Sequence, residues 1–134
     1  MATRSFSRAS REPEIRGDAG GGSRAPRRAR DAIEGGHLSS SVHDSYYAML
    51  YAARAALSER DLNAKTRSGT WHLFRETFVQ SGQFDGELAS EAHDAGRLRQ
   101  SADYEAEPID PDTARSLLAT AERFVDRVVQ LLEP

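Results

Sequence analysis

The chain has 134 residues, of which 38% are hydrophobic and 29% are charged, and this predicts one globular domain with a core of its own. It contains no cysteine, which excludes disulfides, thiolate metal ligands and a cysteine nucleophile. No apolar run approaches the roughly 20 residues that span a membrane, and no secretory signal is recognisable at the N-terminus, so we expect a cytoplasmic protein without membrane contact. The net charge of −3 argues against nonspecific nucleic-acid binding through overall charge.

Charge and glycine are distributed unevenly along the chain. Residues 1–36 hold eight arginines, five acids and six of the ten glycines, whereas residues 37–134 hold ten basic and sixteen acidic side chains. Residues 1–22 have too few large apolar side chains to offset the entropy lost on ordering. We therefore predict a disordered basic Arg/Gly-rich arm over 1–22 and a helical domain over 23–134. We interpret the arm as a solvated tail; the alternative is contact with RNA phosphates or an acidic partner.

The first half of the domain predicts two helices. A short one is expected over 23–35, because Pro26 is tolerated in a first turn and a glycine pair follows. A longer one is expected over about 42–60, where Ser41 and Asp44 resemble a capping box. Its apolar residues recur at helical spacing and form one broad face: Val42, Tyr46, Met49, Leu50, Ala53 and Leu57.

Two more helices are expected in the middle of the chain. One begins after Lys65-Thr66, with Ser68 as its candidate cap, and ends at Gly82. The next is capped by Asp85 and carries one apolar stripe, whose members are Leu88, Ala92, Ala95 and either Leu98 or Arg99.

A final helix is expected from Pro111, with Asp110 as its N-cap and the proline in its first turn. Its apolar face is the most regular in the sequence: Ala114, Leu117, Leu118, Ala121, Phe124, Val125, Val128, Leu131 and Leu132. No stretch alternates with the period of a strand. The sequence therefore predicts an all-α, up-and-down bundle of four to five helices.

Few residues point to chemistry on spacing alone. No phosphate-binding glycine loop is present, and the histidines at 37, 43, 72 and 93 do not pair at helical spacing, so we expect neither a cofactor nor a metal site. His72 and His93 are interpreted as surface or half-buried residues rather than catalysts.

Two segments are richer than packing requires. Residues 46–53 hold three tyrosines among alanines, a composition that packing in a bundle largely explains. Residues 97–104 gather two arginines, an acid and a tyrosine. Arg97 and Arg99 are two residues apart and so point to different helix faces, which requires one of them to face the core or a partner.

Three ordered motifs resemble those of HEPN-domain proteins of the small stand-alone kind. The segment 42–50 (VHDSYYAML) is similar to the family's RAYYAMF helix, with Asp44-Ser45 in place of Arg-Ala. The segment 65–69 (KTRSG), with the later LF and FV pairs, resembles KTHSG…LF…FV, and 97–104 resembles LR..ADY. The resemblance covers about residues 24–133.

This resemblance implies a five-helix bundle that forms a homodimer, with the arginine motifs of both protomers in a shared cleft. It implies metal-independent ribonuclease activity, frequently that of a toxin, and a minimal nucleotidyltransferase as antitoxin. The family motif is an arginine followed four to six residues later by histidine. Here Tyr104 stands five residues after Arg99, and no histidine follows His93.

The resemblance thus carries over Arg99 and Tyr104, with Asp103 between them, as the expected site. Arginine suits phosphate binding, but tyrosine is a poor base at neutral pH, and losing the histidine removes a group worth a factor of roughly 10²–10⁴. The resemblance further implies that Tyr104 is a candidate modification site, because transferases of this kind can attach AMP to a tyrosine at this motif position. Three functions stay open: a toxin-like endoribonuclease or RNA-binding protein, a non-catalytic adaptor that regulates the transferase, and an unrelated structural bundle.

Overall fold

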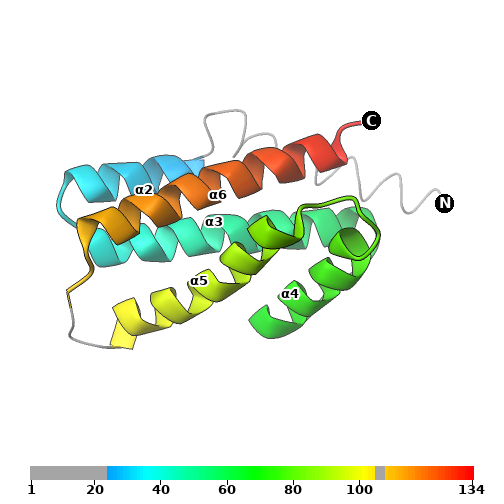
Figure 1. The fold of residues 1–134 in the computed structure, drawn as a ribbon, viewed down its shortest axis with the longest axis horizontal. Coiled ribbons are helices and arrows are strands. Elements are labelled where there is room, and N and C mark those ends of the chain that lie inside the picture. The colour runs from blue at the N-terminus through cyan, green and yellow to red at the C-terminus, as the bar shows by residue number, and fades with distance from the viewer. Residues whose placement is uncertain (1–23, 105–107) are drawn as a thin grey trace.

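The computed structural model describes residues 24–104 and 108–134, and the regular secondary structure of this part of the chain is all helical, without strands (Figure 1). The expected arm over 1–22 lies outside the described residues. The elements in chain order are α2 (Arg24–Glu34), α3 (Leu38–Glu59), α4 (Arg67–Phe74), the π-helical segment η1 (Arg75–Val79), α5 (Gly86–Tyr104) and α6 (Pro111–Leu132). The long helices alternate in direction along the bundle, which confirms the predicted all-α, up-and-down architecture.

A glycine turn joins α2 to α3. Gly36 has a φ of +80°, a backbone conformation that costs glycine little and other residues more. Its N–H donates to the carbonyl of Ile33 (3.0 Å) and the N–H of His37 donates to that of Ala32 (2.7 Å). These two bonds form the Schellman motif that ends many helices, so the predicted end of the first helix is confirmed.

The second helix begins earlier than its sequence pattern predicts. α3 begins at Leu38, directly after the glycine turn, so Ser41 and Asp44 lie inside the helix and form no capping box. Ser41 is instead fully buried. The prediction failed because the chain is helical from residue 38 onward, directly after the glycine turn. Residue 41 therefore does not have the extended backbone conformation that an N-cap residue adopts.

Side-chain caps set the start of α4 and of α5. The Thr66 hydroxyl accepts a hydrogen bond from the N–H of Gly69 (2.9 Å), so the cap of α4 is Thr66 and not Ser68, which lies within the helix. The Asp85 carboxylate accepts from the N–H of Glu87 (2.9 Å), as predicted. The helical segment ends with η1 at Val79, and Gly82, the predicted stop, has a φ of +80° and lies in the turn that follows.

The last two helices begin where their sequence signals predict. α5 runs to Tyr104, so this residue belongs to the helix and not to the loop after it. α6 has Asp110 at its N-cap position and Pro111 in its first turn, although the aspartate side chain makes no cap hydrogen bond. The predicted apolar face of α6 is buried apart from Leu131, which is half-buried.

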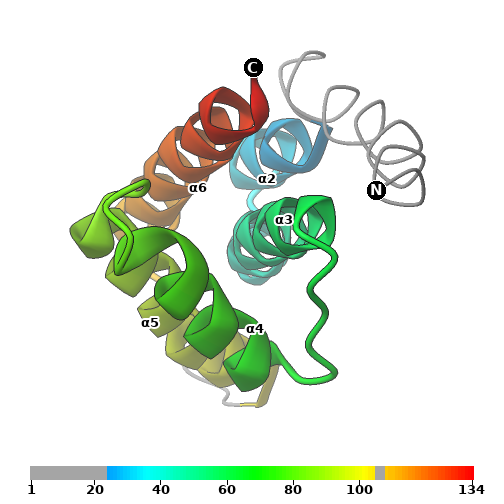
Figure 2. The same cartoon turned by 90° about the vertical axis from the view of Figure 1, so that its right-hand side faces the viewer.

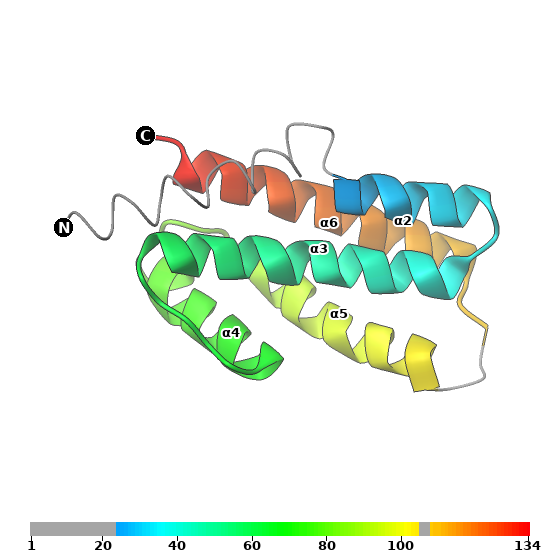
Figure 3. The ribbon, with the colours of Figure 1, turned by 180° about the vertical axis from the view of Figure 1, so that it is seen from behind.

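The core surrounds α3, which packs against α2, α4, α5 and α6 (Figure 2). Its buried alanines allow the neighbouring helices to approach closely, and they are Ala48, Ala52, Ala53 and Ala56. The same core contains an aromatic cluster in which Phe74, Phe84 and Phe124 pack with ring centroids 5.0–5.5 Å apart. Seen from behind, α4 and α5 lie below α3 and are both inclined to it (Figure 3).

Within the described ranges, no helix combines the length and the apolarity needed to span a bilayer.

Candidate functional site: an arginine-lined pocket

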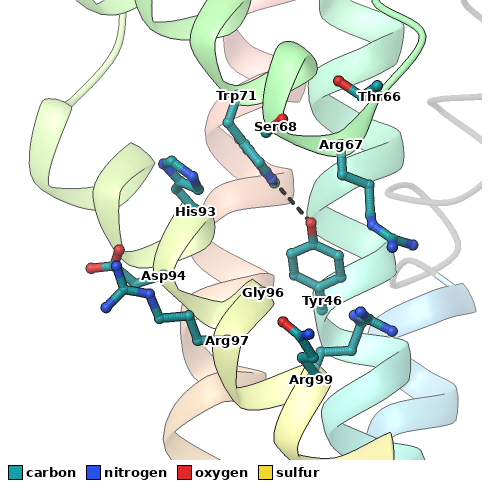
Figure 4. Close-up of a pocket in the computed structure, with 11 residues that line it drawn as sticks. Tyr46, Thr66, Arg67, Ser68, Trp71, His93, Asp94, Gly96, Arg97 and Arg99 are labelled. Carbon is teal, nitrogen blue, oxygen red and sulfur yellow. Dashed lines mark hydrogen bonds between the residues drawn. The ribbon is translucent and has the colours of Figure 1, made fainter.

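A pocket of about 500 Å³ lies where α3, the start of α4 and the second half of α5 meet (Figure 4). Each of the three segments singled out in the sequence contributes to it. From α3 comes Tyr46; from the start of α4 come Thr66, Arg67, Ser68 and Trp71; from α5 come His93, Asp94, Gly96, Arg97, Arg99 and Gln100. Segments far apart in the sequence therefore form one site.

Tyr46 holds these elements together. Its ring is only 2% exposed, and its hydroxyl accepts a hydrogen bond from Nε1 of Trp71 at 3.1 Å. On the other side, α5 comes so close that a Cβ on Gly96 would lie 3.3 Å from Cε1 of Tyr46. The pocket is thus built on a buried tyrosine whose hydroxyl is satisfied by the neighbouring helix.

Arg99 lies on the buried face of α5. Its side chain is 8% exposed, and its guanidinium carbon is 5.8 Å from the ring centroid of Tyr46 and 6.0 Å from that of Tyr47. Contacts of this geometry are cation–π interactions. Leu98 is only half-buried, so Arg99 is the residue that completes the buried stripe of this helix.

Two other arginines reach the same pocket. Nη1 of Arg67 donates to the Tyr47 hydroxyl at 2.8 Å, so that tyrosine lies between Arg67 and Arg99. Arg97 is exposed, as its two-residue offset from the buried Arg99 requires. Asp94 is the single acid among the residues that line the pocket, and the lining therefore carries a net positive charge.

His93 also lines the pocket, beside Trp71. The two rings are nearly parallel, at 20°, with centroids 6.3 Å apart. The imidazole is exposed, in agreement with the sequence interpretation, but this exposed ring faces the pocket and not a bare helix surface (Figure 4).

Asp103 and Tyr104, the other two expected site residues, belong to the last turn of α5, and their side chains lie outside the described part of the structure. Tyr104 follows Arg99 by five residues. Five residues advance an α-helix by about 140° beyond a full turn. The offset therefore does not by itself bring Tyr104 to the helix edge that carries Arg99.

Several lining residues were not predicted as functional. Trp71 and His93 have no spacing signal of their own, because they come from helices that meet only in the folded chain. Arg67 lies in a motif that was noted for its resemblance, not for a role. In the described part of the chain, no group of three or more histidine or acidic side chains is arranged to hold a metal ion.

Comparison with known proteins defines the family. The model of the HEPN domain matches residues 22–132, which include every helix described above. The chain therefore belongs to the HEPN family.

Individual relatives have similar sequences. A UPF0332 protein of Gloeobacter violaceus is 36% identical over 94 residues, which are 69% of this chain and 75% of the relative. Two proteins of Methanocaldococcus jannaschii, each named "Putative toxin", are 32% identical over 93 residues and 31% identical over 96 residues. Each match covers 69% of this chain; it covers 63% of the first archaeal protein and 69% of the second. The family and these names support a toxin-like HEPN protein.

Proposed function

We propose that this protein acts on RNA as a toxin-like HEPN protein and binds the RNA backbone in the arginine-lined pocket. The observation that carries the proposal is the convergence of Arg67, Arg97 and Arg99 on one pocket with a single acid in its lining. Guanidinium groups bind phosphate oxygens through paired N–H donors and keep their charge at every physiological pH. The names of the two archaeal relatives agree with a toxin role, and an RNA target agrees with action in the cytoplasm.

Two activities are consistent with such a pocket: cleavage of RNA, and binding of RNA without cleavage. Cleavage of RNA at the 2′-hydroxyl requires removal of that proton, stabilisation of the charged phosphorane and protonation of the leaving oxygen. The arginines supply the second requirement. The family histidine after Arg99 is absent, so endoribonuclease activity requires a proton-transfer group from elsewhere, and RNA binding does not.

Binding can be measured with the protein's own fluorescence, because Trp71 is the single tryptophan and lines the pocket. We expect a labelled single-stranded RNA of mixed sequence to change this fluorescence saturably. Arg97→Gln should weaken binding and lower the slope of log affinity against log salt by about 0.7, the contribution of one phosphate contact to a single strand. Arg115→Gln, on an exposed helix surface of α6 and paired with Asp112, is the control. Equal affinity in wild type and Arg97→Gln would contradict the proposal.

We also propose that the protein is a homodimer in which two such pockets lie in one shared cleft, as the resemblance implies. A two-fold interface would double the number of arginines available to one RNA strand. Light scattering at micromolar concentration and modest salt should give twice the mass of one chain, whereas a monomer would contradict this assembly.

For the partner, we propose a minimal nucleotidyltransferase antitoxin that attaches AMP to Tyr104. The adduct would add a phosphate charge and a purine near the arginines, so it would compete with RNA without a change of fold. Mass spectrometry after co-expression with such a transferase tests this. An unmodified Tyr104 peptide, or modification that persists in Tyr104→Phe, would contradict it.

A second function is favoured by the same missing histidine. A HEPN bundle without cleavage would act as an adaptor that binds and regulates the transferase. This adaptor function predicts that the protein forms a stable complex with the transferase and does not bind RNA. It also predicts that Arg97→Gln has no effect on the growth of cells that express the protein. An RNA cleavage assay on the pure protein separates the two functions.

A further inference from the structure

We propose that the face formed by the second halves of α3 and α6 binds the chain's own N-terminal segment, with Arg16 paired to Glu59 of α3. Ile15, the neighbour of Arg16, packs on Leu132 of α6. The composition of residues 1–22 allows contact with an acidic partner, and this inference places that partner on the same chain. It does not depend on RNA binding.

The helix α2 covers only part of the face on which it lies. It has 11 residues, whereas α3 and α6 have 22 each, so α2 is about 16 Å long and its two neighbours are about 33 Å long. A glycine turn joins α2 to the start of α3, and Figure 3 shows α2 along the first half of α3 and of α6. The second halves of both helices therefore extend beyond the start of α2.

The second half of α3 is nevertheless buried on the side where α2 packs. Ser45, Ala52 and Glu59 follow one another at seven-residue intervals, so they keep nearly one line along the helix. This line is turned by about 100–140° from Tyr46, which faces the pocket. Ser45 is fully buried, Ala52 is 5% exposed and Glu59 is 9% exposed. Leu132 is also 9% exposed and lies in the last turn of α6, at the same end of the bundle as the end of α3 (Figure 1).

The charges at this end of α3 favour a cation. A carboxylate removed from water is costly unless positive charge or hydrogen-bond donors accompany it. Glu59 is buried, and Asp61 adds a second negative charge beside it. Arg60, between them, is directed to another side: its Nη2 donates to Gln83 at 2.8 Å, and its guanidinium carbon lies 5.1 Å from the ring centroid of Phe78.

Residues 1–22, which lie outside the described residues, supply matching groups. Their arginines are at positions 4, 8, 11 and 16, and Arg16 is the one nearest to α2. Ile15 precedes it and is the large apolar side chain of the segment nearest to α2. A cation next to an apolar residue is complementary to a face that combines Glu59 with Leu132. The composition predicts disorder for the isolated segment, and binding to a preformed face is the kind of contact that orders such a chain.

The chain is long enough for this contact. Arg16 precedes Arg24, the first residue of α2, by eight residues, which span at most about 26–29 Å when extended. Glu59 lies about 16 Å beyond the middle of α3, where α2 begins. The segment can therefore reach Glu59 without any movement of α2.

The lack of cysteine in the chain allows a direct test of the contact by introduced cysteine pairs. In the full-length protein, Ile15→Cys combined with Leu132→Cys should form a disulfide within one chain under mild oxidation, measured by non-reducing mass spectrometry. The matched control combines Ile15→Cys with Ser116→Cys, at an exposed position about 24 Å earlier on α6. The control should form its disulfide roughly tenfold more slowly, because cysteines with Cα atoms more than about 7 Å apart cannot be bridged.

A double-mutant cycle tests the pairing of charges. Arg16→Gln and Glu59→Gln should each raise the equilibrium constant of unfolding by a factor of roughly 10–100, the worth of a hydrogen bond between charged groups. The double variant should raise it no further than the larger single effect, because the contact is already lost. Arg4→Gln is the control and should leave the constant unchanged. Urea unfolding followed by circular dichroism measures all four variants.

The outcomes distinguish the candidate occupants of the face. Equal rates of disulfide formation in the two cysteine pairs overturn the inference, and so do additive effects of Arg16→Gln and Glu59→Gln. A disulfide between two chains assigns the face to a second copy and overturns it as well. If Arg16→Gln weakens RNA binding and leaves stability unchanged, this arginine contacts RNA instead, and the inference is wrong.

Discussion

At the scale of single residues, Tyr46 connects all the elements around the pocket. It lies on α3, accepts a hydrogen bond from Trp71 of α4, faces Gly96 of α5 at close range and contacts the guanidinium of Arg99. Its hydroxyl and its ring are used for different contacts, so the two can be separated by substitution.

Tyr46→Phe should lower the free energy of unfolding by about 1–3 kcal/mol, because it leaves the Nε1–H of Trp71 buried without an acceptor. Urea unfolding followed by fluorescence measures this loss. Tyr51→Phe is the control: that tyrosine is 57% exposed, so its stability change should lie within about 0.5 kcal/mol. Equal losses in both variants would show that the hydroxyl of Tyr46 has no special role.

Ser45, the neighbour of Tyr46, has a fully buried hydroxyl with no hydrogen-bond partner among the described residues. Ser45→Ala should therefore raise the free energy of unfolding by about 1 kcal/mol, through relief of the unsatisfied group and better helix propensity. The exposed helical serine in Ser116→Ala measures propensity alone. If Ser45→Ala stabilises no more than Ser116→Ala, the hydroxyl of Ser45 is satisfied in solution.

Single-residue roles were the least predictable from the sequence. Tyr46 and Trp71 are 25 residues apart, and no local pattern shows that their side chains meet. The sequence did predict that Arg97 and Arg99 face opposite ways, since this depends on helix geometry alone. It left open which of Leu98 and Arg99 is buried, because burial of an arginine depends on the tyrosine rings that another helix supplies.

At the scale of elements, the start of α4 forms one edge of the pocket. Thr66 caps the helix and lines the pocket, and Arg67 follows it directly. The position of the Arg67 guanidinium therefore depends on the cap. The helix continues into η1, where the N–H of Gln80 donates to the carbonyl of Arg75 at 2.9 Å in the π-helical pattern.

Thr66→Ala should lower the free energy of unfolding by about 1 kcal/mol, the usual cost of losing an N-cap side chain. Ser68→Ala should change it by less than about 0.5 kcal/mol, because this exposed serine makes no cap bond. Thermal unfolding of the two variants compares them directly. A larger loss in Ser68→Ala than in Thr66→Ala would mean that α4 begins one or two residues later than in the structure.

Element boundaries were predictable where a side chain or glycine marks them and not elsewhere. Gly82, Asp85 and Pro111 all mark boundaries that the structure confirms. The start of α3 was wrong, because the glycine turn before it allows a helix without a side-chain cap. Nor does the sequence predict η1, since a π-helical turn depends on packing against neighbouring helices rather than on local propensity.

At the scale of the whole molecule, α6 supports the pocket from behind. Its Phe124 is fully buried and lies 5.7 Å from the Trp71 ring centroid, nearly perpendicular to it. The same phenylalanine contacts Phe74 and Phe84. The all-α fold and the α6 face were predictable because apolar periodicity over 22 residues is a strong signal.

Phe124→Ala should destabilise the protein by about 3–5 kcal/mol, the usual cost of removing a buried phenylalanine. This is a large share of the roughly 5–15 kcal/mol that a domain has in total. Urea unfolding should show a lower midpoint, and Trp71 fluorescence should shift in the native state. Arg127→Ala, at an exposed position of the same helix, should leave both unchanged; a loss below about 1 kcal/mol for Phe124→Ala would contradict this packing.

The place of Phe124 in the chain has a consequence for how the protein is made. α6 is the last described helix to leave the ribosome, and its 22 residues take roughly one to four seconds to synthesise. During that interval α3, α4 and α5 exist without the ring that packs behind Trp71. A nascent chain therefore carries all the arginines of the pocket before it has the support that orders them, and the site is completed only once translation has passed α6.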